Sequence, residues 1–139
     1  MDRSTIQWIN SGLEALADPD VRASAERAVP GAVVLGVSVP KIRALVKELR
    51  ASRPQLGFEE AAAYLDAVSE APVRETLLFG IFWTGFYKKA VTTLPWSRVD
   101  AWIDAVTDWE SCDQLANATS GPMVHSRPDL EPNLLKLTE

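Results

Sequence analysis

The chain has 139 residues, of which 47% are hydrophobic and 24% are charged, a composition that fits one globular domain and excludes a wholly disordered chain, a collagen and a coiled coil. Its one cysteine and one histidine exclude an internal disulfide, a multi-cysteine zinc site and a histidine-based metal cluster. The longest apolar run, Leu77–Trp83, is too short to cross a bilayer, and no signal peptide follows Met1, so we expect a reducing cytoplasm.

Apolar residues recur at helical spacing along nearly the whole chain, and turn-forming residues separate the segments. The first predicted helix is capped by Ser4 and ends near Leu16. Asp18 caps a second helix, with Pro19 at its first position, and this helix stops before Pro30.

The middle of the chain continues the pattern. Residues 32–37 are predicted to form a buried extended connection, after which Ser38 starts a third helix. A fourth helix covers residues 58–69, and a fifth, from about 72 to 88, is apolar on most sides and should therefore be central and buried.

The last third of the chain is predicted to hold three more helices. Residues 92–95 form a loop, Ser97 caps the sixth helix, and Asp108 caps the seventh, which runs from Trp109 to near Ala118. The Gly121-Pro122 pair should break the chain before a final helix at residues 130–137.

Short helices joined by short loops indicate antiparallel pairs. The pairs start near residues 4, 38, 72 and 109, in steps of about 34 to 37 residues, which is the period of helical-hairpin repeats that stack into a solenoid. We therefore predict an all-α fold in one domain over residues 1–139.

Trp109 and Asp113 form the sharpest candidate site. They are four residues apart, so the ring and the carboxylate lie on one helix face, an arrangement that suits a cationic guest. Asp113 is too far into the helix to cap it. The alternative is a core tryptophan and an aspartate paired with a neighbouring Arg or Lys.

A basic stripe is the second candidate site. Arg43, Lys47 and Arg50 recur at i, i+4 and i+7 along one helix face, and Lys88 stands at the expected end of the fifth helix. Because the formal net charge is −5, any DNA-binding role needs such a local basic face. The alternatives are a solvated polar face beside Glu48 and, for Lys88, complementation of a helix dipole.

The aromatic residues of the second half are expected to be core rather than a cofactor site. This set comprises Trp83, Phe86, Tyr87, Trp96 and Trp102.

The order of these motifs resembles the bacterial DNA alkylation repair glycosylase family, whose fold is built of HEAT-like helical repeats. The resemblance rests on Gly36–Leu45 (GVSVPKIRAL), Val73–Glu75 (VRE), the Val99-Asp100 pair and Trp109–Asp113 (WESCD), and it extends over nearly all of the chain. It implies HEAT-like antiparallel pairs stacked as a short right-handed solenoid.

The resemblance also implies an activity, namely excision of positively charged N3- or N7-alkylated purines from duplex DNA by cutting the N-glycosidic bond. Asp113 would be the essential carboxylate and Trp109 an aromatic wall at the lesion, with Arg43, Lys47, Arg50 and Lys88 as phosphate contacts. No metal or cofactor is implied.

Two features of the chain depart from the family. Its members are longer, so we expect this domain to be truncated at its C-terminus, with an uncapped solenoid end through which two copies could associate. Its net charge is acidic. The alternatives to an enzyme are a non-catalytic DNA-binding module and a protein-interaction scaffold on the same HEAT-like fold.

Overall fold

The computed structural model describes residues 2–31, 33–106, 109–130 and 132, except for the side chains of residues 109 and 110. This part of the chain is helical and contains no strand, which confirms the predicted all-α fold. Its helices are α1 (Arg3–Leu16), α2 (Pro19–Ala28), α3 (Val39–Ser52), α4 (Phe58–Ser69), α5 (Arg74–Gly85), α6 (Lys88–Val91), α7 (Trp96–Ala105), α8 (Trp109–Leu115), the π-helix η1 (Ala116–Ser120), α9 (Gly121–Ser126) and the 3-10 turn η2 (Pro128–Leu130).

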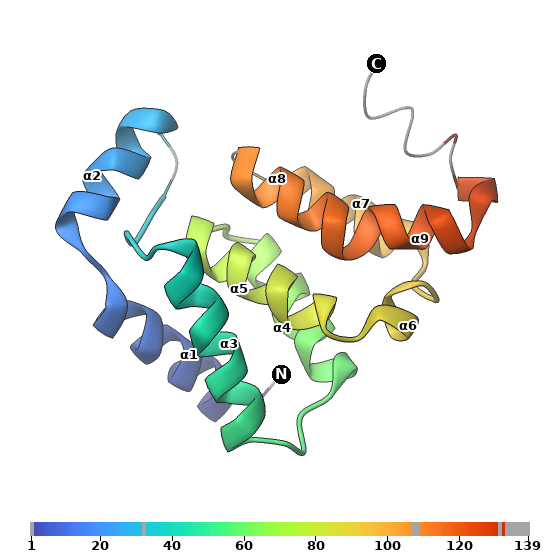
Figure 1. Cartoon of the computed structure of the whole chain (residues 1–139), viewed down its shortest axis with the longest axis horizontal. Coiled ribbons are helices and arrows are strands. Elements are labelled where there is room, and N and C mark those ends of the chain that lie inside the picture. The colour runs from blue at the N-terminus through green and yellow to red at the C-terminus, as the bar shows by residue number, and fades with distance from the viewer. Residues whose placement is uncertain (1, 32, 107–108, 131, 133–139) are drawn as a thin grey trace.

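The helices pack in the order in which the predicted pairs begin. α1 packs against α3, α3 against α5, and α5 against α8, while α4 and α7 pack against each other on another side of α5 (Figure 1). The four predicted pair starts, near residues 4, 38, 72 and 109, fall at the beginnings of α1, α3, α5 and α8. A right-handed, HEAT-like solenoid and the association of two copies stay predictions.

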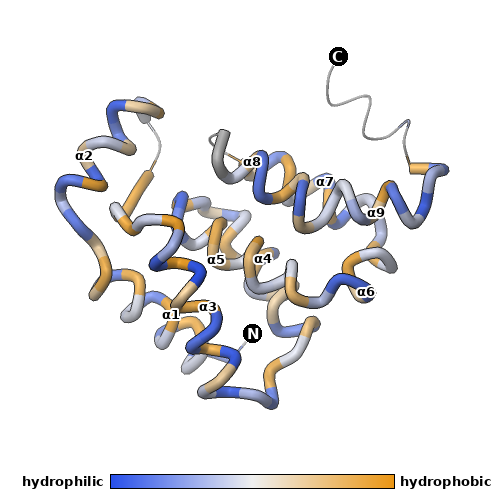
Figure 2. The backbone as a smooth tube through the Cα atoms, in the orientation of Figure 1, coloured by the Kyte–Doolittle hydropathy of each residue, from blue (hydrophilic) through white to orange (hydrophobic). Residues whose placement is uncertain are grey.

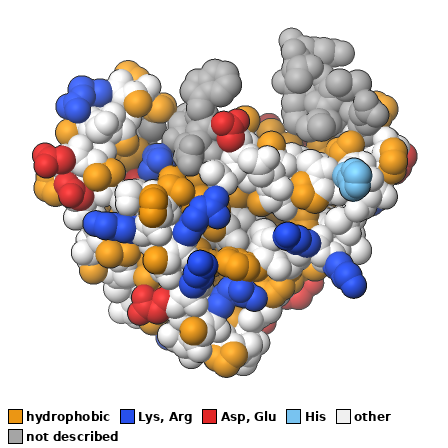
Figure 3. Space-filling model, viewed as in Figure 1, with side chains coloured by type: hydrophobic (Ala, Val, Ile, Leu, Met, Phe, Trp, Pro, Cys, Tyr) orange, Lys and Arg blue, Asp and Glu red, His pale blue; other side chains and the backbone are white. Residues whose placement is uncertain are grey.

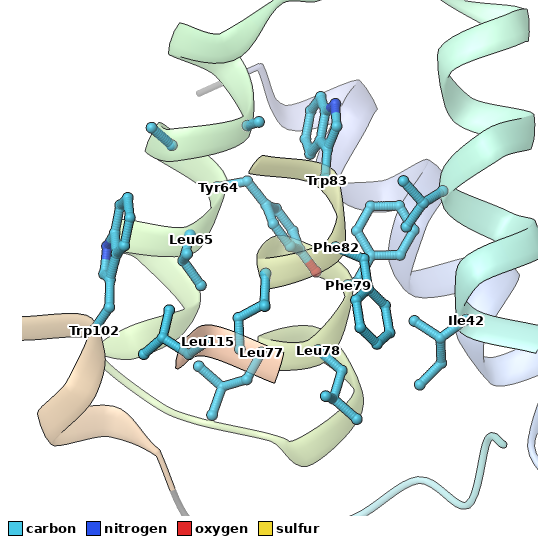
Figure 4. Packing of buried hydrophobic residues seen from close by; sticks show 14 of the residues in the cluster. Ile42, Tyr64, Leu65, Leu77, Leu78, Phe79, Phe82, Trp83, Trp102 and Leu115 are labelled. Carbon is cyan, nitrogen blue, oxygen red and sulfur yellow. The ribbon is translucent and has the colours of Figure 1, made fainter. Parts of the chain in front are cut away.

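α5 is the centre of the core. Every residue from Glu75 to Thr84 is buried, as its apolar sequence predicts. Figure 2 shows hydrophobic residues along α5 and at intervals along its neighbours. The rings of Tyr64, Phe79 and Trp83 contact one another at centroid distances of 5.7–6.2 Å. Buried residues from α3, α4, α7 and α8 surround this cluster (Figure 4).

Several predicted helix starts are confirmed and two are wrong. Asp18 caps α2 by accepting a hydrogen bond from the Asp20 amide at 2.8 Å. α1 is capped by Asp2 rather than Ser4, because the Asp2 carboxylate accepts from the Ser4 amide at 3.1 Å. α7 begins at Trp96 after Pro95, so Ser97 lies inside its first turn.

The predicted fifth helix is too long at both ends. α5 spans Arg74–Gly85, and Lys88 begins the separate short helix α6. Gly85 stands where α5 approaches α8 and η1 closely, since a Cβ there would lie 3.1 Å from the Ala118 Cβ.

The predicted break at Gly121-Pro122 is wrong, because the chain stays helical from Trp109 to Ser126. The π-helix η1 explains how a proline is accommodated. The Gly121 amide donates to the Ala116 carbonyl, five residues back, whereas an α-helix would use the carbonyl four residues back. Pro122, which has no N–H, therefore follows a turn that does not have the α-helical hydrogen-bond pattern. A Cβ at Gly121 would lie 2.6 Å from the Ala116 carbonyl oxygen, which explains the glycine.

The connection between α2 and α3 follows the prediction only in part. Val34, Gly36 and Val37 are buried, but Val33 is 60% exposed and Gly36 has a φ of +91°, which is not an extended backbone. A buried carboxylate holds this connection. Glu75 of α5 accepts from the amides of Leu35 at 2.7 Å, Gly36 at 3.0 Å and Val37 at 3.3 Å. Arg74 Nη1 lies 3.3 Å from the same carboxylate. One acid on α5 thus fixes the path of the chain into α3.

Two further predictions concern the ends of elements. Asp108, expected to cap α8, and most of the expected helix at residues 130–137 lie outside the described residues. Within the described part, no helix combines the length and apolar character that a membrane crossing requires.

Candidate nucleic-acid interface

α3 presents its basic residues on one exposed side. Arg43, Lys47 and Arg50 are exposed, whereas Ile42, Val46 and Leu49 on the opposite side are fully buried. Glu48, the acid that could have neutralised the stripe, lines a different hollow, between α1 and α3. The stripe is therefore not an evenly mixed polar face.

Arg43 reaches from α3 across α5 to α8. Its Cζ lies 4.0 Å from the centroid of the Phe82 ring, and its Nη2 donates to Gln114 Oε1 at 2.9 Å. Lys88 joins these three residues around one open hollow of about 380 Å³. A guanidinium stacked on a ring loses little of its hydrogen-bonding capacity. Arg43 is therefore held in place while further N–H groups of its guanidinium can donate to a ligand.

A second hollow lies beside the first. Lys47 and Arg50 line it together with Phe86 and Tyr87, and its volume is about 740 Å³. Arg50 Cζ lies 4.1 Å from the centroid of the Phe86 ring and 5.6 Å from that of Tyr87. Phe86 lines both hollows, so the two form one continuous surface, which we call the basic face.

The basic face carries charge of one sign. It contains the four cations predicted from the sequence, and no aspartate or glutamate is among the described residues that line its two hollows. Figure 3 shows several Lys and Arg side chains gathered in the middle of this face of the molecule, with acidic side chains also in view around them. The acidic net charge is thus carried elsewhere and does not forbid a polyanion here.

Asp113 lies on α8, next to the basic face. It is exposed, and among the described residues none forms a hydrogen bond or ion pair with it. It directly precedes Gln114 and stands about one turn before Asn117, both of which line the first hollow. Ser111 and Leu115 are buried and anchor α8 against α5.

Both readings of the Trp109–Asp113 pair stay predictions. The alternative of an aspartate neutralised by a neighbouring cation has no support among the described residues. Trp109 is the first residue of α8, but its side chain lies outside the described part of the structure. Its role as an aromatic wall stays a prediction.

Three side chains of the basic face were missed by sequence reasoning. Phe82, Phe86 and Gln114 hold or border the cations, and the available signals were the i, i+4 spacing of the phenylalanines and the position of Gln114 after Asp113. Phe86 was expected in the core, which is wrong because 41% of it is exposed. It follows the last residue of α5, beyond the buried part of the helix.

The rest of the aromatic set follows expectation. Trp83 and Trp102 are buried, and Tyr87 and Trp96 pack against the core while partly exposed. Among the described residues, no three His, Cys, Asp or Glu side chains are placed to hold a metal ion together.

Comparison with known proteins gives one match. Residues 9–139 match the model of a protein family described as DNA alkylation repair enzyme. No curated protein and no solved structure matches the chain.

Proposed function

The chain belongs to the family of DNA alkylation repair enzymes, and on that premise we propose that it is an N-glycosylase that excises positively charged N3- or N7-alkylpurines from duplex DNA. The observation that carries the proposal is the basic face, on which Arg43, Lys47, Arg50 and Lys88 surround two adjoining hollows beside α8. Phosphates of a duplex would bind these cations, and their binding would release counterions.

Asp113 supplies the chemistry in this proposal. Cleavage breaks the bond between C1′ of the sugar and the purine nitrogen, and the bonding pair leaves with the base, whose positive charge it neutralises. The sugar becomes an oxocarbenium-like cation, which a nearby carboxylate stabilises. Asp113 then orients a water molecule and takes its proton as the oxygen bonds to C1′. The products are the free alkylated base and an abasic site.

The experiment follows release of the free base from a duplex that contains N7-methylguanine, by chromatography, for the whole chain. We expect release by the wild type and a decrease of about 10²–10³-fold in Asp113→Asn, since one placed charge typically contributes that much. Asp104→Asn is the matched control, because Asp104 is also an exposed helical aspartate but lies on α7. Equal rates for the wild type and Asp113→Asn would refute the role of Asp113.

A non-catalytic DNA-binding module is the second candidate. One observation favours it: Asp113 is exposed, and a carboxylate in contact with water stabilises a developing cation less than a sheltered one. Binding of the methylated duplex without release of base would support this candidate. Absence of binding at low salt would instead leave a protein-interaction scaffold.

A further inference from the structure

Phe86 is an anomaly on the surface of this protein. In the described part of the chain, Val33 and Phe86 are the large hydrophobic residues with wide exposure, 60% and 41% respectively. Val33 lies in the connection before α3, whereas Phe86 stands where the two hollows of the basic face meet. Because the ring lines both hollows together with the cations, a partner that binds the cations would also meet the ring.

The surroundings of Phe86 fix the ring and define the charge of that partner. Arg50 Cζ lies 4.1 Å from the ring centroid on the side of the second hollow, and Arg43 and Lys88 line the first hollow with Phe86. The ring is therefore bordered by cations on two sides and by no acid among the described lining residues. Such a frame fits a polyanion and disfavours an apolar protein surface, which would have to bury these cations unpaired.

A duplex offers apolar surface only between its phosphate strands. If cations on both sides of Phe86 hold phosphates, the ring faces the sugar and base edges in the groove between them. Proteins that bind the minor groove use phenylalanine in this position, where the ring enters between neighbouring base pairs. We propose that Phe86 is the apolar contact of the basic face with duplex DNA, its ring entering the minor groove beside phosphates bound by Arg50 and Lys88.

This inference rests on the proposed binding of duplex DNA and adds to it a contact that is not electrostatic. The two kinds of contact respond differently to salt. Loss of one phosphate contact lowers the magnitude of the slope of log K against log salt concentration by about 0.9, where K is the association constant, whereas loss of an apolar contact lowers K by the same factor at every salt concentration.

The test measures dissociation constants of a fluorescently labelled duplex over a range of salt concentrations for the wild type and four variants. We expect Phe86→Ala to weaken binding about tenfold with an unchanged slope, as a central interface residue does. Phe86→Leu should restore most of the affinity. Lys47→Gln is the electrostatic control and should lower the magnitude of the slope by about 0.9. Arg50→Lys keeps the charge without the stacked guanidinium, and should weaken binding less than Phe86→Ala.

A duplex that carries 2-aminopurine reports whether the ring enters the stack of bases. We expect its fluorescence to rise with the wild type and with Phe86→Leu, and to stay unchanged with Phe86→Ala at saturating protein. A Phe86→Ala variant that binds within twofold of the wild type, or that raises the fluorescence equally, would overturn the inference while leaving the proposed function intact. Failure of the wild type to bind any duplex at low salt would overturn both.

Discussion

Replacement of Glu75 by glutamine tests how the connection between α2 and α3 is held in place. α3 is the helix that carries the basic stripe. The carboxylate is fully buried and accepts from three backbone amides, those of Leu35, Gly36 and Val37. A glutamine of nearly the same volume keeps one acceptor oxygen and places an NH₂ group against these donors. The substitution therefore removes hydrogen bonds without leaving a cavity.

The expected cost is large for a domain of this size. A hydrogen bond to a charged group contributes about 1.5–3 kcal/mol, and breaking a buried, hydrogen-bonded charge typically costs about 3–5 kcal/mol in total. Since domains are stable by about 5–15 kcal/mol, Glu75→Gln should lose about a third of its stability or more. With a urea m-value of about 2 kcal/mol/M, the midpoint of unfolding falls by about 2 M.

Urea unfolding followed by circular dichroism measures this loss, and amide hydrogen exchange locates it. Exchange should accelerate first at Leu35, Gly36 and Val37. Glu14→Gln is the control, because Glu14 is an exposed acid in α1, and its unfolding free energy should stay within about 0.5 kcal/mol of the wild type. The reasoning is refuted if Glu75→Gln is as stable as this control.

Substitutions at Tyr64, Gly36 and Asp66 test the packing, with Gly31 as a control position. Tyr64 is buried, and its hydroxyl has no hydrogen-bond partner among the described residues, so Tyr64→Phe should leave the unfolding free energy unchanged or raise it by about 1 kcal/mol; a loss above 1 kcal/mol would contradict this. Burial also raises the pKa of Tyr64 above its ordinary value of 10.0. The unfolded phenol then loses its proton at a pH where the folded one keeps it, so wild-type stability should fall above about pH 10, more steeply than in Tyr64→Phe. Gly36→Ala should cost about 2–4 kcal/mol in thermal or urea unfolding, because φ is +91° and a Cβ would lie 2.6 Å from the Asp18 carbonyl oxygen. Gly31→Ala, with φ at +88° and nothing within 4 Å, should cost only about 1 kcal/mol, and equal losses would disprove the steric argument. Asp66→Ala should cost about 1–2 kcal/mol, because it removes the acceptor of the Trp102 indole N–H at 2.7 Å, whereas Asp66→Asn keeps an acceptor and should cost less; the reverse order would refute this.

Local signals predicted much of the fold. The Asp18-Pro19 start of α2 and the full extent of α4 follow from capping chemistry and apolar spacing, both of which act within a few residues. The break at Gly121-Pro122 was predicted wrongly, because the π-turn that absorbs the proline depends on a hydrogen bond five residues back. Composition does not encode such a change of register.

In the candidate site, too, the features set by spacing within one helix were predicted, and the contacts between elements far apart in the sequence were not. The spacing of Arg43, Lys47 and Arg50 placed them on one side of α3. The guanidinium of Arg43 lies over the Phe82 ring and that of Arg50 over the Phe86 ring. These contacts depend on how α3 packs against α5, which the spacing does not predict. Gln114 is 71 residues from Arg43 along the chain, so no local pattern could have joined them.

The placement of charge has a kinetic consequence. A molecule with a formal charge of −5 that collects four cations in one region is electrically one-sided. A polyanion would be attracted to the basic face and repelled by the acidic parts of the surface. The electrostatic field would therefore orient the two molecules during their diffusional encounter, before any close contact forms. Association would then slow as salt screens the attraction over distances of about 10 Å.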